Sequence, residues 1–203
     1  MRLPSILQLF SFLFLLVSQP CLEGATYTVS STSDDGSFGT LRYALLNSVS
    51  GDTISFSSSL NGTITIGSST TYPTALPYLK GVTILGNGNT ISGSSTYPIF
   101  FAYSGSSTIS NLDLRNGLGQ GGNGGTGYGG GGGGLGAGGS LFICPGATVV
   151  TSQVSFSNST VIGGMGGASS GAAGGGGGGL FGSNGGNGGT STGGGGGGGG
   201  LFN

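Results

Sequence analysis

The chain of 203 residues is almost uncharged, with four Lys or Arg, five Asp or Glu, no His and a net charge of −1. A nucleic-acid partner is excluded, because phosphates are bound by clusters of Lys and Arg and this chain has none. The missing His also excludes a Ser–His–Asp triad, and the low charge excludes disorder driven by charge repulsion.

The N-terminus has the order of a secretory signal peptide. Arg2 precedes an apolar run over residues 6–17, and small residues suited to cleavage follow the run. The run is too short to cross a bilayer, which needs about 20 apolar residues. A buried N-terminal helix and a lipid anchor at Cys21 are the alternatives. We expect residues 1–24 to be a signal peptide, with the mature chain beginning near Ala25 and no membrane span remaining in it.

Residues 25–115 are rich in Ser, Thr and Asn and contain many short runs of β-branched and aromatic residues. Turn residues, such as the Gly and Asn of 86–89, separate the runs. Strands this short are typical of a coiled solenoid, in which each turn adds short parallel strands and the core grows by stacking. We predict an all-β fold, a parallel β-helix over residues 25–162. Its expected strands lie at 27–29, 53–56, 63–66, 82–85, 90–92, 99–101, 108–110, 147–150, 153–156 and 159–162.

One helical pattern interrupts these strands at residues 40–47. Leu41, Ala44 and Leu45 have the i, i+3, i+4 spacing of an apolar helix stripe. Thr40 is suited to the N-cap, where its hydroxyl accepts a hydrogen bond from an otherwise unpaired backbone N–H. Solenoids need capping elements at their ends. We therefore expect a short helix that covers the first turn of the coil.

The C-terminal part, residues 116–203, contains 41 of the 52 glycines and no charged residue. A Leu-Phe pair follows Gly or Gly-Ser at 141–142, 180–181 and 201–202. This recurrence favours glycine tracts inserted at one corner of the coil, with each Leu-Phe pair returning to the core; a disordered linker is the alternative. Because Gly loses the most entropy on ordering, we expect the tracts, and residues 163–203 in particular, to be mobile.

Several stretches resemble the opening of bacterial surface β-helices, namely residues 35–45, 51–56 and 85–93. Residues 138–142 are similar to the Gly-Gly-Ala-Ile repeat of these proteins, whereas Ser159 replaces the last Asn of their Phe-x-x-Asn repeat. The group includes autotransporter-like proteins and the polymorphic outer-membrane proteins of chlamydia-like bacteria. The resemblance implies export to the cell surface, outer membrane or medium, a right-handed β-helix passenger with an adhesin role, and a C-terminal β-barrel that this chain does not contain.

Four Asp residues remain after the signal peptide, and many β-helices cleave polysaccharides with paired carboxylates. Asp34 and Asp35 are neighbours in a loop and point apart, and Asp52 lies at a turn. Asp113 and Arg115, two residues apart, would share one face of a strand. That pair is either a lyase-type site or a solvated ion pair. Because lyases usually gather several acids for calcium, we predict the ion pair.

Other single features predict no chemistry. Cys144 lies in an apolar run, and we expect a small buried hydrophobe there, with a reactive thiol as the alternative. Thr63 and Thr65 have the spacing of an ice-binding face, but the pattern occurs once, so we expect no ladder. We predict no catalytic, metal-binding or cofactor-binding residues.

The last expected turn of the coil, residues 141–162, would expose unpaired strand edges and stacked apolar side chains. No charge after Arg115 opposes contact with another copy, so we expect self-association end to end. The sequence as a whole predicts an exported, non-catalytic, adhesin-like surface scaffold that contacts carbohydrate or the surface of a host or other cell. A degenerate pectate-lyase-like enzyme and a decayed reading frame without function are the alternatives.

Overall fold

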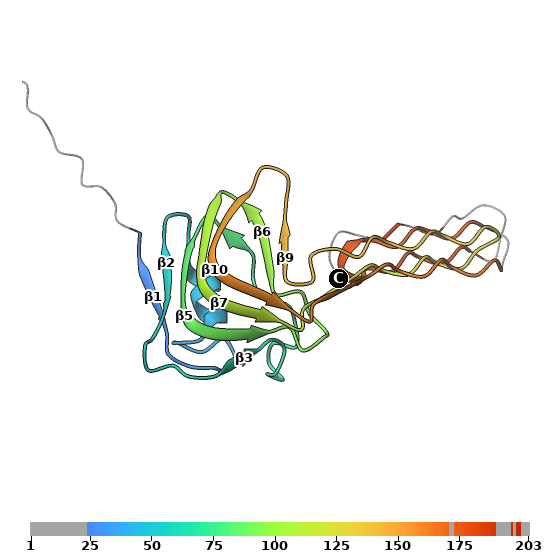
Figure 1. Cartoon of the computed structure of the whole chain (residues 1–203). Coiled ribbons are helices and arrows are strands. Elements are labelled where there is room, and N and C mark those ends of the chain that lie inside the picture. The colour runs from blue at the N-terminus through green and yellow to red at the C-terminus, as the bar shows by residue number, and fades with distance from the viewer. Residues whose placement is uncertain (1–23, 171–172, 190–195, 197, 200–203) are drawn as a thin grey trace, which may run out of the picture.

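The structure is a computed structural model that describes residues 24–170, 173–189, 196, 198 and 199 (Figure 1). The expected signal peptide therefore lies outside the described residues, except for Gly24. Within the described part, no helix has both the length and the apolar character needed to cross a membrane.

Parallel strands dominate the described chain. The largest sheet contains, in order of pairing, β1 (Thr26–Val29), β2 (Thr53–Phe56), β5 (Thr83–Ser92), β7 (Ser106–Arg115) and β10 (Thr148–Ser157), with β3 (Thr63–Thr65) also beside β5. A second sheet has the order β4 (Leu79–Lys80), β6 (Phe100–Ser104) and β9 (Leu141–Ile143), and β8 (Leu118–Gln120) pairs with β11 (Thr160–Ile162). Paired residues are 23 to 42 positions apart. The prediction of an all-β fold with parallel strands is confirmed.

Three of the long strands bend at one corner. Asn87, Asn111 and Gln153 have φ angles of 51°, 53° and 54°, in the left-handed region that Asn tolerates better than most residues. Strands β7 and β10 are paired on both sides of this bend, but Asn111 and Gln153 at the bend are not paired with each other. The expected turn at 86–89 is therefore a bend inside β5, and the two strands predicted on either side of it are one strand.

The core consists of columns of aliphatic side chains that stack from strand to strand. Ile54, Ile84 and Ile109 are aligned by the strand pairing and are fully buried. Around the corner, the same holds for the column of Ile64, Ile91 and Leu114. Burial of such a side chain stabilises the fold by roughly 1.5–3 kcal/mol, so the alternation of apolar and polar residues determines which face of each strand points inward.

The helix α1 (Leu41–Asn47) covers one end of this core, as predicted. Thr40 is its N-cap, and the Thr40 hydroxyl accepts a hydrogen bond of 3.2 Å from the backbone N–H of Tyr43. Leu41, Ala44 and Leu45 are buried in the same apolar cluster as the strand columns. The helix ends at Ser48, whose backbone is extended.

The glycine-rich residues form an ordered projection, which we call the glycine bundle, beside the coil (Figure 1). Its first layer contains residues 162–170, 119–128 and 182–189, and its second layer contains residues 130–137, 173–180 and 196–199, of which 197 is not described. Chains within a layer run parallel, since Gly124 and Gly127 donate to Met165 and Ala168. Chains in opposite layers run antiparallel, since Gly122 and Gly125 donate to Gly179 and Gly176.

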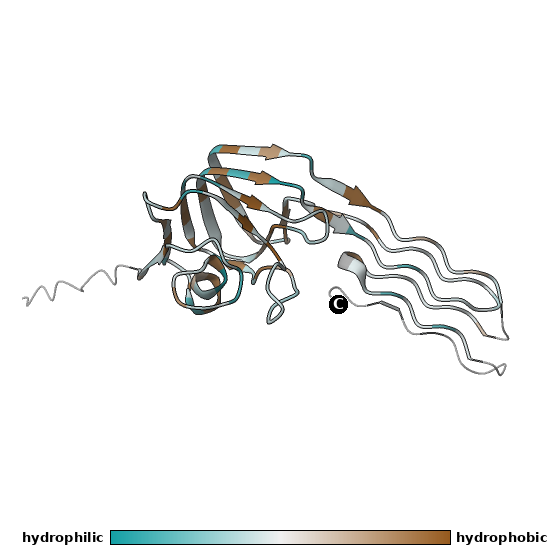
Figure 2. Ribbon diagram, turned by 90° about the horizontal axis from the view of Figure 1, so that it is seen from below, coloured by the Kyte–Doolittle hydropathy of each residue, from teal (hydrophilic) through white to brown (hydrophobic). Residues whose placement is uncertain are grey.

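These hydrogen bonds recur at every third residue, which is the period of the polyproline II helix. That helix has no internal hydrogen bonds, so its backbone groups are available to neighbouring chains. Figure 2 shows the chains of the bundle side by side, with hydropathy near neutral. In the described part of the tracts, the structure thus differs from the expectation of mobility, whereas residues 171–172, 190–195, 197 and 200–203 of the expected mobile segment lie outside the described residues. The entropy lost by glycine is opposed by a hydrogen-bond network that forms only when several chains meet.

Candidate functional site

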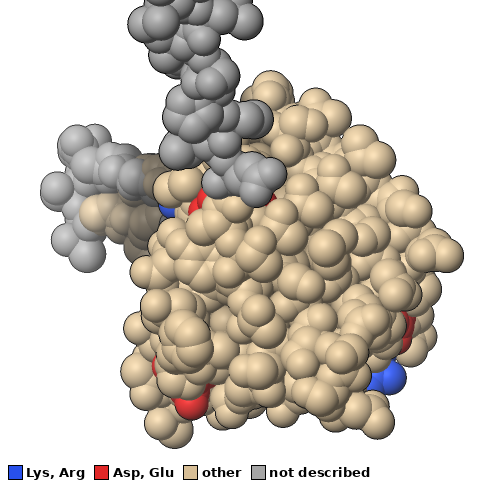
Figure 3. Space-filling view, turned by 90° about the vertical axis from the view of Figure 1, so that its left-hand side faces the viewer, with Lys and Arg blue, Asp and Glu red and all other residues tan. Residues whose placement is uncertain are grey.

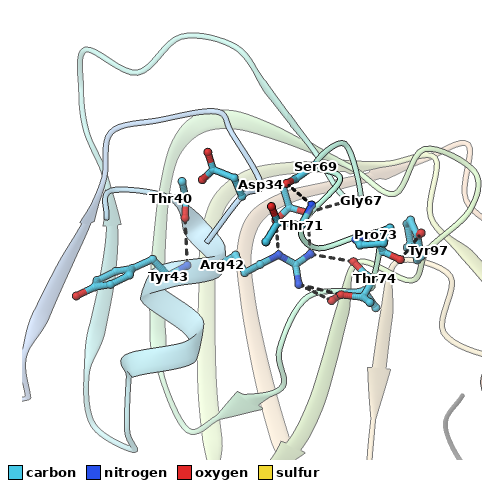
Figure 4. Close-up of polar contacts among 12 residues, drawn as sticks. Asp34, Thr40, Arg42, Tyr43, Gly67, Ser69, Thr71, Pro73, Thr74 and Tyr97 are labelled. Carbon is cyan, nitrogen blue, oxygen red and sulfur yellow. Dashed lines mark hydrogen bonds and ion pairs between the residues drawn. The ribbon is translucent and has the colours of Figure 1, made fainter. Parts of the chain in front are cut away.

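The acidic residues near the cap helix α1 make hydrogen bonds that stabilise the fold. Arg42 donates to both carboxylate oxygens of Asp34, at 2.8 and 2.7 Å, and both side chains are buried (Figure 4). Arg42 also donates to the backbone carbonyls of Thr74 and Ala75 at 2.8 Å, and Asp34 accepts the N–H of Gly67 at 2.8 Å. The pair therefore ties the cap to the loop between β3 and β4. Sequence reasoning missed it, because nothing local marks Arg42 as buried.

The carboxylate of Asp35, the next residue, is exposed. The prediction that Asp34 and Asp35 point apart is therefore confirmed. Asp35 accepts hydrogen bonds from the Ser37 hydroxyl at 2.6 Å and the Ser37 backbone N–H at 3.0 Å. These bonds hold the pKa of the Asp35 carboxyl below its ordinary value. Asp52 is buried at the predicted turn, where it accepts the N–H groups of Ala25 and Val49 at 2.7 and 2.8 Å. It joins the start of β1 to the turn before β2.

The predicted ion pair between Asp113 and Arg115 is wrong. Asp113 accepts a hydrogen bond of 2.6 Å from Ser155, and Arg115 donates one of 2.9 Å to Thr63. Both side chains do lie on the outer face of β7, as expected, but Asp113 bonds the adjacent strand β10, and Arg115 reaches across β5 to bond β3. Ser155 is paired with Asp113 in the sheet, and such cross-strand partners are closer than residues two apart on one strand. The long side chain of Arg115 instead extends over β5 to the hydroxyl of Thr63.

Cys144 is half-buried, so the expected burial of this thiol is also wrong. It follows β9, at the edge of the second sheet, where the described chain places no further turn over it. No three or more of His, Cys, Asp and Glu come together as a metal-binding group within the part of the chain described.

An aromatic groove lies on the outer side of the second sheet, and its lining includes Pro73, Tyr78, Tyr97, Phe101 and Gln120. Its volume is about 350 Å³, within the usual size of small-ligand pockets. The rings of Tyr78 and Phe101 lie 5.4 Å apart. The hydroxyl of Tyr97 donates to the carbonyl of Pro73 at 2.8 Å, which holds two of its walls together.

The aromatic groove continues into a row of rings along the sheet. Phe142 of β9 stacks on Phe101 of β6 with their centroids 5.2 Å apart, and Tyr103 lies 5.7 Å from Tyr78. The two residues of the Leu-Phe pair at 141–142 therefore point in opposite directions. Leu141 packs against the core, as predicted, whereas Phe142 faces outward. Phe101 and Tyr103 are separated by Ala102 on one strand, so the two rings point to the same face. This spacing is the sequence signal that could have indicated the row of rings.

The groove is completed by residues at the root of the glycine bundle, which is the end of the bundle that joins the coil. Gln120, at the end of β8, and Gly182, in the short helix η1 (Leu180–Gly182), both line the groove. The sequence separates these two residues from Pro73 and Tyr97 by long stretches of chain, so the pattern of residues did not place them at one site.

No protein-family model matches this chain, and neither a curated protein nor a solved structure does.

Proposed function

We propose that the protein is an exported surface scaffold of the right-handed parallel β-helix type, which binds neutral carbohydrate on another surface without catalysing a reaction. The observation that carries the proposal is the aromatic groove on the flank of a regular coil. Parallel strands that pair with partners one circuit later, and bend at aligned corners, support the β-helix. The signal-peptide pattern supports export to the cell surface, outer membrane or medium.

The chemistry of the groove suits a sugar. A pyranose ring has apolar C–H faces and hydroxyl groups around its edge. Tyr78, which is 39% exposed, provides an aromatic face for the C–H groups of the sugar. Thr74, Thr96 and Gln120 provide polar groups for its hydroxyls. None of the residues that line the groove is charged, which favours a neutral oligosaccharide over an acidic one.

We expect Tyr78→Ala to weaken the binding of neutral oligosaccharides about tenfold, because an aromatic contact contributes roughly 0.5–1.5 kcal/mol beyond its buried area. Tyr128→Ala is the matched control, since Tyr128 lies in the glycine bundle with 77% of its surface exposed. Titration calorimetry against a glycan panel measures both variants. Equal affinity of Tyr78→Ala and the unaltered protein would contradict the site.

No observation favours the alternative of a pectate-lyase-like enzyme. That reading depended on a joint role for Asp113 and Arg115, and these residues bind Ser155 and Thr63 instead.

We also propose that copies associate end to end through β10 and β11. Phe156 of β10 is paired with Leu114 of β7 and continues its column of stacked side chains. Leu114 is completely buried, whereas Phe156 is 50% exposed. Val161 of β11 is 57% exposed. Exposed strand edges with apolar side chains and no charge favour pairing with another chain.

Light scattering after size exclusion should therefore detect oligomers of the folded protein, with folding verified by circular dichroism. Phe156→Lys should yield monomers, because a charge would then have to be buried between the stacked ends. Phe38→Lys, a change at a ring that is 85% exposed on the cap, should leave the oligomers intact. A folded, unaltered protein that stays monomeric would refute end-to-end association.

A further inference from the structure

The outer face of the largest sheet has two straight rows of side chains, which we call the hydroxyl array. The first row contains Thr26, Thr53, Thr83, Thr108 and Val150, and the second contains Thr28, Ser55, Leu85, Ser110 and Ser152. Eight of these ten positions thus have a hydroxyl group. They point outward because the residue between the two rows on each of the three central strands, Ile54, Ile84 or Ile109, is fully buried.

The rows cross five strands, and no strand in them is out of register. The one register shift between β5 and β7 lies between Leu85 and Asn89, past the array. Neighbouring strands are spaced by about 4.7–4.9 Å, and residues two apart along a strand by about 6.6 Å. The array is therefore a two-dimensional lattice of hydroxyl groups with fixed repeats in both directions.

This finding corrects the expectation that no threonine ladder exists. Besides the pattern at Thr63 and Thr65, the sequence contains three related motifs: Thr26, Thr53 and Thr83 each begin a three-residue motif that ends in Thr, Ser or Leu. Their spacing of 27 and 30 residues is one circuit of the coil, so the ladder exists only after folding.

The array has no ionisable or aromatic residue at any of its ten positions. Figure 3 views the molecule from the side of β1 and β2, and the atoms shown there are almost all uncharged, with charged groups near the margins. A charged ligand has no counter-charge on the array, and a sugar ring has no aromatic face to stack on. The aromatic groove, on the other sheet, differs in both shape and chemistry.

Water is the ligand that a lattice of hydroxyl and methyl groups matches. Each Thr offers a hydroxyl that hydrogen-bonds water and a methyl group that limits how that water is oriented. A shallow hollow of about 500 Å³ borders the second row, lined by Ser55, Ser110 and the corner residues Asn87 and Asn111. This hollow has both polar and apolar groups in its lining and is large enough for bound water.

We propose that the hydroxyl array binds ice. The repeat across the strands is close to the shorter repeat of water oxygens in hexagonal ice, so waters held along the two rows continue the crystal lattice. Rigidity is required, because waters are ordered only on groups that are themselves fixed. The buried isoleucine column behind the array provides it. This function goes beyond carbohydrate binding and uses no residue of the groove.

Thermal hysteresis and the inhibition of ice recrystallisation test the proposal on the purified protein. We expect the unaltered protein to show both effects, and Thr83→Lys to lose most of each, because a long charged side chain at the centre of the array keeps the surface away from the crystal. Thr90→Lys is the matched control: Thr90 lies on the same strand, is also half-buried, and faces outward beyond the corner. It should retain both effects.

Circular dichroism and the melting temperature of each variant establish that it is folded. An unaltered protein without hysteresis would overturn the proposal, and so would an equal loss in Thr83→Lys and Thr90→Lys. Binding to microcrystalline cellulose that Thr83→Lys abolishes, in a protein without hysteresis, would assign the array to a polysaccharide instead. Because Tyr78→Ala leaves the array intact, failure of carbohydrate binding is distinguishable from failure of ice binding.

Discussion

Arg42→Met should lower the free energy of unfolding by about 3–5 kcal/mol, the usual cost of leaving one member of a buried ion pair without its partner. Asp34 would keep its hydrogen bond from Gly67 but would lose both bonds from the guanidinium. The carbonyls of Thr74 and Ala75 would lose their donor as well. Urea unfolding followed by circular dichroism measures the change.

Asp35→Asn is the control for this prediction. Asp35 is adjacent in sequence but exposed, and surface substitutions usually change stability by less than about 0.5 kcal/mol. A similar loss in the two variants would show that the charge of the loop matters and that the buried pair does not. The comparison therefore separates the ion pair from the general electrostatics of the cap.

Gly125→Ala should open the glycine bundle. A methyl group there would overlap the backbone carbonyl of Gly186, so the chains must move apart. Two hydrogen bonds depend directly on this residue: its N–H donates to Gly176, and its carbonyl accepts from Gly131. At about 0.5–1.5 kcal/mol each, their loss destabilises the bundle by about 1–3 kcal/mol.

Gly132→Ala is the matched control in the same bundle. Nothing lies within 4 Å of the position of its added methyl group, and Ala restricts the unfolded chain, so the bundle should be unchanged or more stable by about 0.4–1 kcal/mol. Amide hydrogen exchange in residues 119–137 and 173–180 reports on the bundle separately from the coil. Faster exchange in both variants, or in neither, would contradict the layered packing.

The glycine composition thus has a specific physical cause. Positions that face another chain, such as Gly122, Gly125 and Gly175, have no room for a side chain. Positions that face solvent accept one, and Asn123 uses it to accept the N–H of Met165 at 2.9 Å. The entropy cost of glycine alone predicts mobile tracts. The partner chains of the hydrogen-bond network lie up to about 60 residues apart, so no local pattern shows the network.

The sequence by itself determined the elements that depend on local patterns. Alternating apolar residues placed β1, β2 and β3, because burial of one face is decided by the residues of that strand. The apolar stripe and Thr40 placed α1, because a helix and its cap are built from contacts within one turn.

Only the tertiary structure decided which distant residues meet. The Asp34–Arg42 pair needs the loop at 67–75 to close over it, and the aromatic groove needs the root of the glycine bundle beside β6. The hydroxyl array needs five circuits of the coil in one register. Each of these depends on the length of the circuits and the positions of the corners, which no local pattern of residues specifies.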